Sequence, residues 1–232
     1  MAQKQQKNSP DRTGDTRERL LRAALEEFGI HGYEGVSTRQ LANHAGVNLA
    51  AIPYHFGGKE GVYLAVAEEI VASVGSAMRG RIEPIWDDLQ NGEPLSQKRL
   101  LEHLHSLLGG LARVLLGSPD AQLWAGIILR EQMHPTRAFD ILYRNIMEQV
   151  HRTLTRIIAR LLERPPDDPD CILRAHAVIG EVVIFRAARE AIMRRMDWDD
   201  YTPQRVEHIT QLLIAQTSDM LLAQRRREKT AK

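Results

Sequence analysis

The side chains best suited to binding chemistry lie between positions 37 and 60, in the stretch STRQLANHAGVNLAAIPYHFGGKE. Ser37 is a favourable N-cap, and Gln40 three residues later can complete a capping box. These signals predict a short helix over residues 38–45. Gly46 follows at the point where a sharp turn needs a positive φ, which glycine adopts without a steric penalty.

A second short helix is expected from Asn48, its N-cap, to Tyr54. Ile52 would face back onto the first helix, beside the small Ala42, so that the two helices can cross closely. This spacing is typical of a DNA-binding helix-turn-helix, whose second helix enters the major groove. A helical corner packed only for stability has the same spacing, and the spacing alone leaves that alternative open.

Several side chains in this stretch are suited to contacting DNA. The Thr38 hydroxyl in a first helical turn and the Lys59 ammonium at the start of the next helix both favour a phosphate. Asn48 is the amide that can read a base, whereas Leu49 and Ala50 offer apolar contacts to a thymine methyl. Arg39 suits a phosphate or a base edge, and Tyr54 and His55 have polar tips that can reach phosphates. The predicted DNA contacts are Thr38, Arg39, Asn48, Leu49, Ala50, Tyr54, His55 and Lys59.

The elements that must position these residues are helical throughout. We expect residues 1–14 to form a flexible arm and residues 15–60 to form a three-helix DNA-binding domain. A further helix is predicted from Lys59 to Met78, followed by a loop at 85–95. Later helices are expected near 96–116, 120–133, 136–163, 169–196 and 203–226, ended by Gly117, Pro119, Pro135, Pro165 and Pro203.

No segment alternates polar and apolar residues, so the fold class is all-α. The expected architecture is an N-terminal three-helix helix-turn-helix domain followed by a larger helical bundle. Residues 61–226 form this ligand-binding and dimerisation domain, and residues 227–232 form a basic tail. The segments 169–196 and 203–226 are apolar enough either to close the monomer core or to pair with a second chain. We favour the homodimer, because a helix-turn-helix normally reads two half-sites.

The composition restricts the classes of function. The 31 basic and 30 acidic residues leave a net charge of +1, which argues against an architectural protein that binds DNA without an effector or sequence preference. The single cysteine fits a reducing compartment, and neither a secretory signal nor a membrane span is visible. We therefore expect a cytoplasmic protein that does not enter a membrane.

An all-α enzyme is the remaining alternative. There is no H-E-x-x-H motif, no histidine pair four residues apart, no phosphate-binding glycine loop and no nucleophile elbow. We therefore predict no catalytic residue, no metal site and no cofactor.

The stretch 37–60, with a helix on either side, resembles the N-terminal domain of TetR-family transcriptional regulators. The resemblance covers about residues 15–75 and is carried by Thr38, Leu41-Ala42, Ala45-Gly46-Val47, Tyr54, His55-Phe56, Lys59-Glu60 and Ala24, Phe28, Gly32 and Tyr33. The stretches REQMHP at 130–135 and IGEVVIFRAAR at 179–189 resemble the C-terminal domain of the CecR-like branch. One departure is Pro53, where the family usually has tyrosine. Proline cannot donate to the Leu49 carbonyl and disfavours helix at Ile52, so we expect a distorted or shortened recognition helix.

This resemblance implies a homodimer that binds an inverted-repeat double-stranded DNA operator and acts as a repressor released by a small-molecule effector. The expected effector pocket lies among facing helices of the larger domain. Its candidate residues are Trp124, Ile128, Met133, His134, Phe185, Arg186 and Arg189. The two arginines either bind an anionic effector or pair with Glu181, Glu190 or another carboxylate, because an unpaired charge in an apolar helix is costly.

Overall fold

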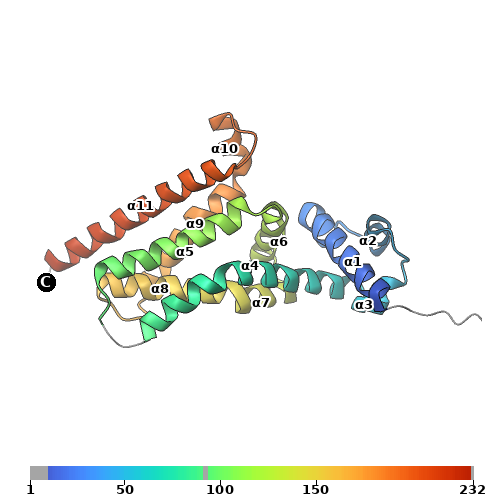
Figure 1. Cartoon of the computed structure of the whole chain (residues 1–232), viewed down its shortest axis with the longest axis horizontal. Helices are drawn as coiled ribbons and strands as arrows, with labels where there is room; N and C mark the ends of the chain where they lie inside the picture. Colours follow the sequence, from blue (N-terminus) through green and yellow to red (C-terminus); the bar gives the residue numbers. More distant parts are fainter. Residues whose placement is uncertain (1–9, 91–93, 231–232) are drawn as a thin grey trace, which may run out of the picture.

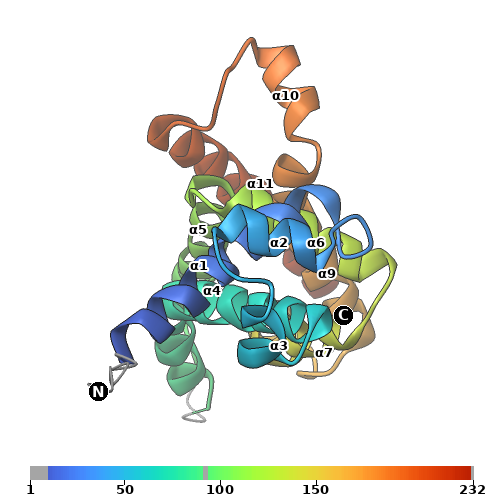
Figure 2. The same ribbon diagram turned by 90° about the vertical axis from the view of Figure 1, so that its right-hand side faces the viewer.

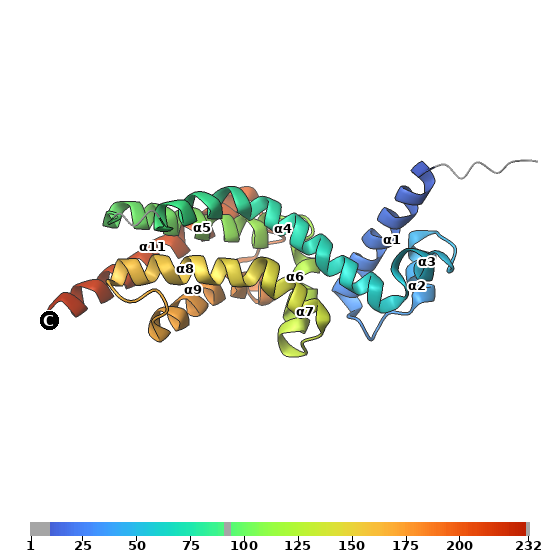
Figure 3. The same ribbon diagram turned by 90° about the horizontal axis from the view of Figure 1, so that it is seen from below.

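A computed structural model describes residues 10–90 and 94–230, and every regular element in these ranges is a helix. The all-α prediction is therefore confirmed. Figure 1 shows an elongated molecule with a small helical unit at one end and a larger helical body at the other. One long helix, α4 (Lys59–Gln90), runs from the small unit into the body, as Figure 3 shows from below.

The small unit consists of α1 (Pro10–His31), α2 (Thr38–Ala45), α3 (Ala51–Phe56) and the first turns of α4. These helices meet around a common set of buried side chains. The fully buried members include Leu20, Ala24, Phe28, Leu41, Ile52 and Val62. Burial of each large aliphatic or aromatic side chain contributes about 1.5–3 kcal/mol, so this core can hold the two short helices in place.

Helix α1 starts earlier than the sequence suggests. Residues 10–14 belong to the helix and not to a flexible arm, since a proline such as Pro10 fits the first helical position, where the missing N–H would have no partner. The remaining part of the predicted arm, residues 1–9, lies outside the described ranges.

Helix α4 also continues beyond its predicted end. Pro84 lies inside it, and the predicted loop over 85–90 is helical. The reason is that Ile82, Ile85 and Leu89 extend the buried stripe of the helix, while Pro84 faces solvent. By length and composition alone α4 could cross a membrane. Its apolar residues instead pack in the cores of both units.

The body contains α5 (Gln97–Gly117), α6 (Ala121–Met133), α7 (Arg137–Leu142), α8 (Glu148–Leu162), α9 (Pro169–Ala187) and α11 (Pro203–Thr230). Helix α5 packs against α4, α8, α9 and α11, so it is the centre of the bundle. The segment predicted as one helix over 136–163 is continuous, but a π-helical turn, η1 (Tyr143–Met147), separates α7 from α8.

The segment predicted as one helix over 169–196 is divided. It breaks at Ala188 into α9 and α10 (Arg189–Met196), which stands out from the rest of the molecule in Figure 2. The Tyr201 hydroxyl donates to the Phe185 carbonyl oxygen, which is the acceptor that a continuous helix would offer to the Arg189 N–H.

The predicted basic tail is also helical in its described part. Helix α11 runs to Thr230, where Glu228 pairs with Arg164 at 2.7 Å and Lys229 pairs with Glu163 at 3.0 Å. These ion pairs join the end of α11 to the end of α8.

Candidate nucleic-acid interface

Helix α2 and the turn after it have the geometry of a helix-turn-helix. The Gln40 N–H donates to Ser37 Oγ at 3.2 Å, and the Ser37 N–H donates to Gln40 Oε1 at 2.8 Å, so the predicted capping box is confirmed. Gly46 has φ 63°, the left-handed conformation predicted for it. The Val47 N–H then donates to the Ala42 carbonyl oxygen at 2.9 Å and closes the turn.

Arg19 of α1 holds this turn from the other side. Its guanidinium donates to the Ala45 carbonyl oxygen at 2.6 Å and to the Gly46 carbonyl oxygen at 2.7 Å. These carbonyls have no partner within α2, and a cation at a helix C-terminus is favourable. Sequence reasoning missed Arg19, because nothing in its local pattern links it to a turn 26 residues away.

The second helix is shorter than predicted. Asn48 begins a turn, in which its Oδ1 accepts a hydrogen bond from the Ala50 N–H at 2.8 Å, and α3 starts only at Ala51. The Leu49 carbonyl, which a residue at 53 would normally use, accepts from the Ile52 N–H at 3.2 Å. Pro53 therefore lies in the first turn of α3, where it removes no helical hydrogen bond.

The turn and α3 form an exposed surface at the end of the molecule that Figure 2 faces. Leu49 is 44% exposed and Tyr54 is 78% exposed, while Asn48 and Ala50 are also exposed. His55 is half-buried, with its ring centroid 4.8 Å from that of Tyr54. Large apolar and aromatic groups this exposed on a small unit are expected of a binding surface.

Lys59 lies at the first position of α4. Its Nζ is 4.2 Å from the centroid of the Tyr33 ring, and the adjacent Glu60 pairs instead with Arg137 at 3.2 Å. Within residues 10–90 and 94–230, neither Lys59 nor Arg39 at the start of α2 forms a salt bridge. Both cations are therefore available to an external anion.

Gly61 sets how closely α3 and α4 approach. A Cβ at this position would lie 1.7 Å from the Phe56 carbonyl oxygen, so only glycine fits. This contact places the start of α4, and with it Lys59, beside the end of α3. The sequence gives no local sign of this role.

His44 joins the end of α2 to α1. Its Nδ1 lies 2.7 Å from Glu27 Oε1, and its Nε2 lies 3.1 Å from Glu26 Oε2. The hydrogen bond with Glu27 and the two nearby carboxylates raise the pKa of His44.

Helix α6 forms the joint between the small unit and the body. Arg130 donates to the carbonyl oxygens of Phe28, Gly29 and Ile30 at 3.1, 2.9 and 2.8 Å, so it caps the C-terminus of α1. A Cβ at Gly126 would lie 2.4 Å from the Gly29 carbonyl oxygen, so the two helices are in backbone contact.

A buried carboxylate connects α6 to α4. Glu131 is 2% exposed and accepts hydrogen bonds from the Tyr63 hydroxyl at 2.8 Å and the Thr136 N–H at 2.9 Å. Burial and the hydrogen bond to Glu131 raise the pKa of Tyr63 well above its ordinary value, so Tyr63 remains a donor at neutral pH. Polar contacts of α6 therefore reach both α1 and α4.

The residues predicted to line an effector pocket differ in their surroundings. Trp124 is buried in the core, Ile128 and Phe185 are half-buried, and Met133 is 66% exposed beside the exposed His134. The prediction assumed that residues of α6 and α9 face each other across the bundle. Helices α6 and α9 are in contact, but Met133 and His134 at the end of α6 face solvent.

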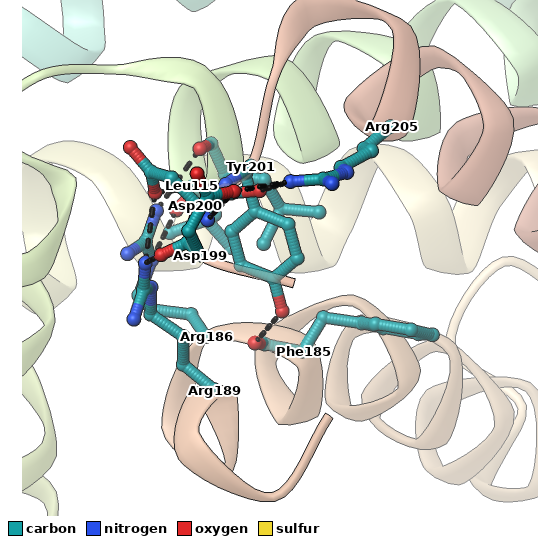
Figure 4. A network of polar contacts seen from close by, with 9 residues as sticks. Leu115, Phe185, Arg186, Arg189, Asp199, Asp200, Tyr201 and Arg205 are labelled. Carbon is teal, nitrogen blue, oxygen red and sulfur yellow. Dashed lines mark hydrogen bonds and ion pairs between the residues drawn. The ribbon is translucent and has the colours of Figure 1, made fainter. Parts of the chain in front are cut away.

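The two candidate arginines have structural partners, shown in Figure 4. Arg186 donates to the carbonyl oxygens of Leu115 at 2.7 Å and Leu116 at 3.0 Å, and it therefore caps α5. Arg189 pairs with Asp200 at 2.9 Å, and not with Glu181 or Glu190. The expectation of internal pairing is right for Arg189, although the carboxylate lies on the loop before α11.

Two family models match this chain. Residues 20–66 match "Bacterial regulatory proteins, tetR family", and residues 98–224 match "HTH-type transcriptional dual regulator CecR, C-terminal domain". The HTH-type transcriptional dual regulator CecR of Shigella flexneri is 32% identical over 198 residues, which cover 84% of this chain and 86% of that protein. The regulatory protein RaaS of Mycobacterium tuberculosis is 36% identical over 116 residues, covering 47% and 50% of the two chains.

Solved structures share the fold. A transcriptional regulator from Pseudomonas aeruginosa PAO1 superimposes with a TM-score of 0.64 at 16% identity, covering 95% of this chain and 96% of that one. The hemolysin II transcriptional regulator HlyIIR superimposes with a TM-score of 0.56 at 17% identity, covering 87% and 98%. At these identities the comparison concerns the fold alone.

Proposed function

Because this chain belongs to the TetR family of transcriptional regulators and has a CecR-type C-terminal domain, we propose that it is a cytoplasmic homodimeric repressor. It binds an inverted-repeat DNA operator and leaves it when a small molecule binds the body. The observation that carries the DNA-binding assignment is the exposed surface formed by the Asn48–Ala50 turn and α3, between the starts of α2 and α4.

The phosphate contacts come from the two helix starts. Thr38 and Arg39 stand in the first turn of α2, and Lys59 is the first residue of α4, so free backbone N–H groups accompany each side chain. Tyr54 and His55 lie on α3, which comes between these two helix starts in the chain, and they contact further phosphates of the DNA backbone.

Base reading belongs to the turn before α3. Asn48 uses its Oδ1 to hold the turn, which leaves the Nδ2 hydrogens for an acceptor on a base edge. Leu49 and Ala50 present exposed apolar groups next to it, suited to a thymine methyl.

The dimer is supported by α9 and α11, each of which has one apolar face buried in the monomer and large apolar side chains exposed on another face. In these helices Val178, Val182, Ile209 and Leu213 are buried in the monomer core. Other large apolar side chains of the same helices remain exposed, at 68% for Leu173, 55% for Ile184, 52% for Leu212 and 37% for Met220. Pairing these faces in two subunits forms a four-helix interface and places two reading surfaces on one duplex, about 34 Å apart.

The test is DNA binding by variants of Lys59, using a duplex selected from random sequence by the wild-type protein. Lys59→Ala should weaken binding to every duplex and reduce the salt slope by about one per subunit. Lys98→Ala, on an exposed turn of α5 in the body, is the matched control and should leave the slope unchanged. An unaltered slope for Lys59→Ala would remove this residue from the interface.

A further inference from the structure

A cavity of about 380 Å³ lies between α7 with η1, α8 and α9, away from the effector residues expected from the sequence. One wall is aromatic, since the rings of Phe139 and Tyr143 stack with centroids 5.8 Å apart and planes 23° apart. Met147 and Ile172 add apolar surface. The volume falls within the range of about 300–1,000 Å³ that holds drug-sized ligands.

Arg156 also lines this cavity, and no carboxylate of the described residues neutralises it. The Arg156 Cζ lies 4.2 Å from the centroid of the Trp86 ring, and Trp86 is fixed by its Nε1–H bond to Thr153 Oγ1 at 2.7 Å. Among residues 10–90 and 94–230, Arg156 has no salt bridge, whereas the neighbouring Arg152 pairs with Glu148 at 3.5 Å. A stacked and unpaired guanidinium is a good receptor for a carboxylate.

Two histidines from different helices face each other in the same cavity. The rings of His151 on α8 and His176 on α9 have centroids 5.3 Å apart and planes 30° apart. Burial, and to a lesser extent the charge of His176, lower the pKa of His151. An anion beside the His151 ring would favour its protonated form, and this adds to the attraction from Arg156.

We propose that this cavity binds a small aromatic carboxylate, and this inference rests on the proposed function because the cavity is then the effector site. The ring of the ligand packs against Phe139 and Tyr143, and its carboxylate faces Arg156 and the histidine pair. The two acids that line the cavity do not favour a cationic ligand, since Glu148 is paired with Arg152 and Asp167 is exposed.

The position of the cavity links it to the joint between the two units. Gln132, at the end of α6, lines the cavity and directly follows Glu131, which holds α4 through Tyr63. A ligand that draws α8 and α9 toward Gln132 therefore acts on α6. The same helix carries Arg130, which caps the C-terminus of α1.

The test compares two aromatic acids with neutral analogues that keep the ring. Binding of 2-naphthoate and benzoate is measured by isothermal titration calorimetry against 2-naphthalenemethanol and benzyl alcohol. At least one acid should bind about tenfold more tightly than its alcohol, the effect expected of one charge-assisted hydrogen bond.

Arg156→Gln should remove this preference, with folding checked by circular dichroism. The matched control is Arg160→Gln, one turn further along α8, where the side chain does not line the cavity. His176→Gln, at an exposed position of α9, should reduce the preference several-fold without affecting stability. The proposal is overturned if neither acid binds at about 10 mM, if the alcohols bind equally well, or if Arg156→Gln keeps the preference.

Operator binding distinguishes this inference from the proposed function. If an acid binds with an Arg156-dependent preference and the operator affinity is unchanged, the ligand class stands and effector release fails. If the dimer binds its operator and ignores every acid, the DNA-binding function stands and the ligand class is overturned.

Discussion

Removal of the Glu131 carboxylate should weaken the joint between α4 and α6 by a large and specific amount. Glu131 is 2% exposed, and its oxygens accept from the Tyr63 hydroxyl at 2.8 Å, the Thr136 N–H at 2.9 Å and the Thr136 hydroxyl at 3.0 Å. Glu131→Ala leaves the Tyr63 hydroxyl and the Thr136 N–H without their acceptor. Each lost partner costs about 1–3 kcal/mol, so the free energy of unfolding should fall by about 2–6 kcal/mol.

Two milder variants divide this effect. Glu131→Gln keeps the shape and one acceptor oxygen, and should cost about 1–2 kcal/mol. Tyr63→Phe removes one hydroxyl while Thr136 still binds the carboxylate, and should cost about 1 kcal/mol. The expected order of stability is therefore wild type, then Tyr63→Phe, then Glu131→Gln, then Glu131→Ala.

Thermal and urea unfolding measure this order. At about 2–4 °C per kcal/mol for a chain of this size, Glu131→Ala should lower the Tm by roughly 4–24 °C. Glu102→Ala, which removes an exposed partner of Arg99, is the control and should change stability by less than about 1 kcal/mol. The reasoning fails if Glu131→Ala stays within about 0.5 kcal/mol of wild type, or if Tyr63→Phe costs as much as Glu131→Ala.

Three further predictions address the small unit and the dimer. Gly61→Ala places a Cβ 1.7 Å from the Phe56 carbonyl oxygen, so α3 and α4 must separate. The DNA affinity should then fall while the helix content measured by circular dichroism changes little. A normal DNA affinity would refute this close contact. The hydrogen bond with Glu27 raises the pKa of His44. The stabilisation of the fold by protonated His44 is therefore complete at a pH below the ordinary pKa of 6.5, and it is lost as the pH rises through the pKa of the folded state. In urea titrations the wild type should therefore lose stability, relative to His44→Ala, as the pH rises above the ordinary His44 pKa of 6.5, and parallel pH profiles would contradict this. Leu212→Glu puts a charge in the proposed interface of α9 and α11, so the variant should be a monomer in sedimentation equilibrium. A variant that remains a dimer would show that Leu212 does not lie in the interface.

Local signals explain why α2 could be predicted from the sequence. Ser37, Gln40 and Gly46 act within a few residues of their own positions, and the structure reproduces the capping box and the left-handed turn. Such signals depend little on the rest of the chain, because the partners are neighbours in sequence.

The errors come from partners that are distant in sequence. The helix that starts at Lys59 is predicted to end at Met78, but buried residues on either side of Pro84 keep α4 intact to Gln90. Tyr201 divides the predicted helix over 169–196 through a hydrogen bond to Phe185, 16 residues earlier. The partner of Arg186 could not be predicted for the same reason, because the end of α5 that it caps lies about 70 residues earlier in the chain.

Pro53 shows how a departure from the family pattern can be absorbed without loss of the fold. Because the chain delays the start of α3 to Ala51, Pro53 lies in the first turn and the Leu49 carbonyl is bonded to Ile52. The cost of this arrangement is a six-residue helix that presents less side-chain surface to a groove. In the proposed DNA complex, base contacts then come from the turn that Asn48 holds through its own side chain, so we expect the conformation of this turn and the choice of operator to depend on the same residue.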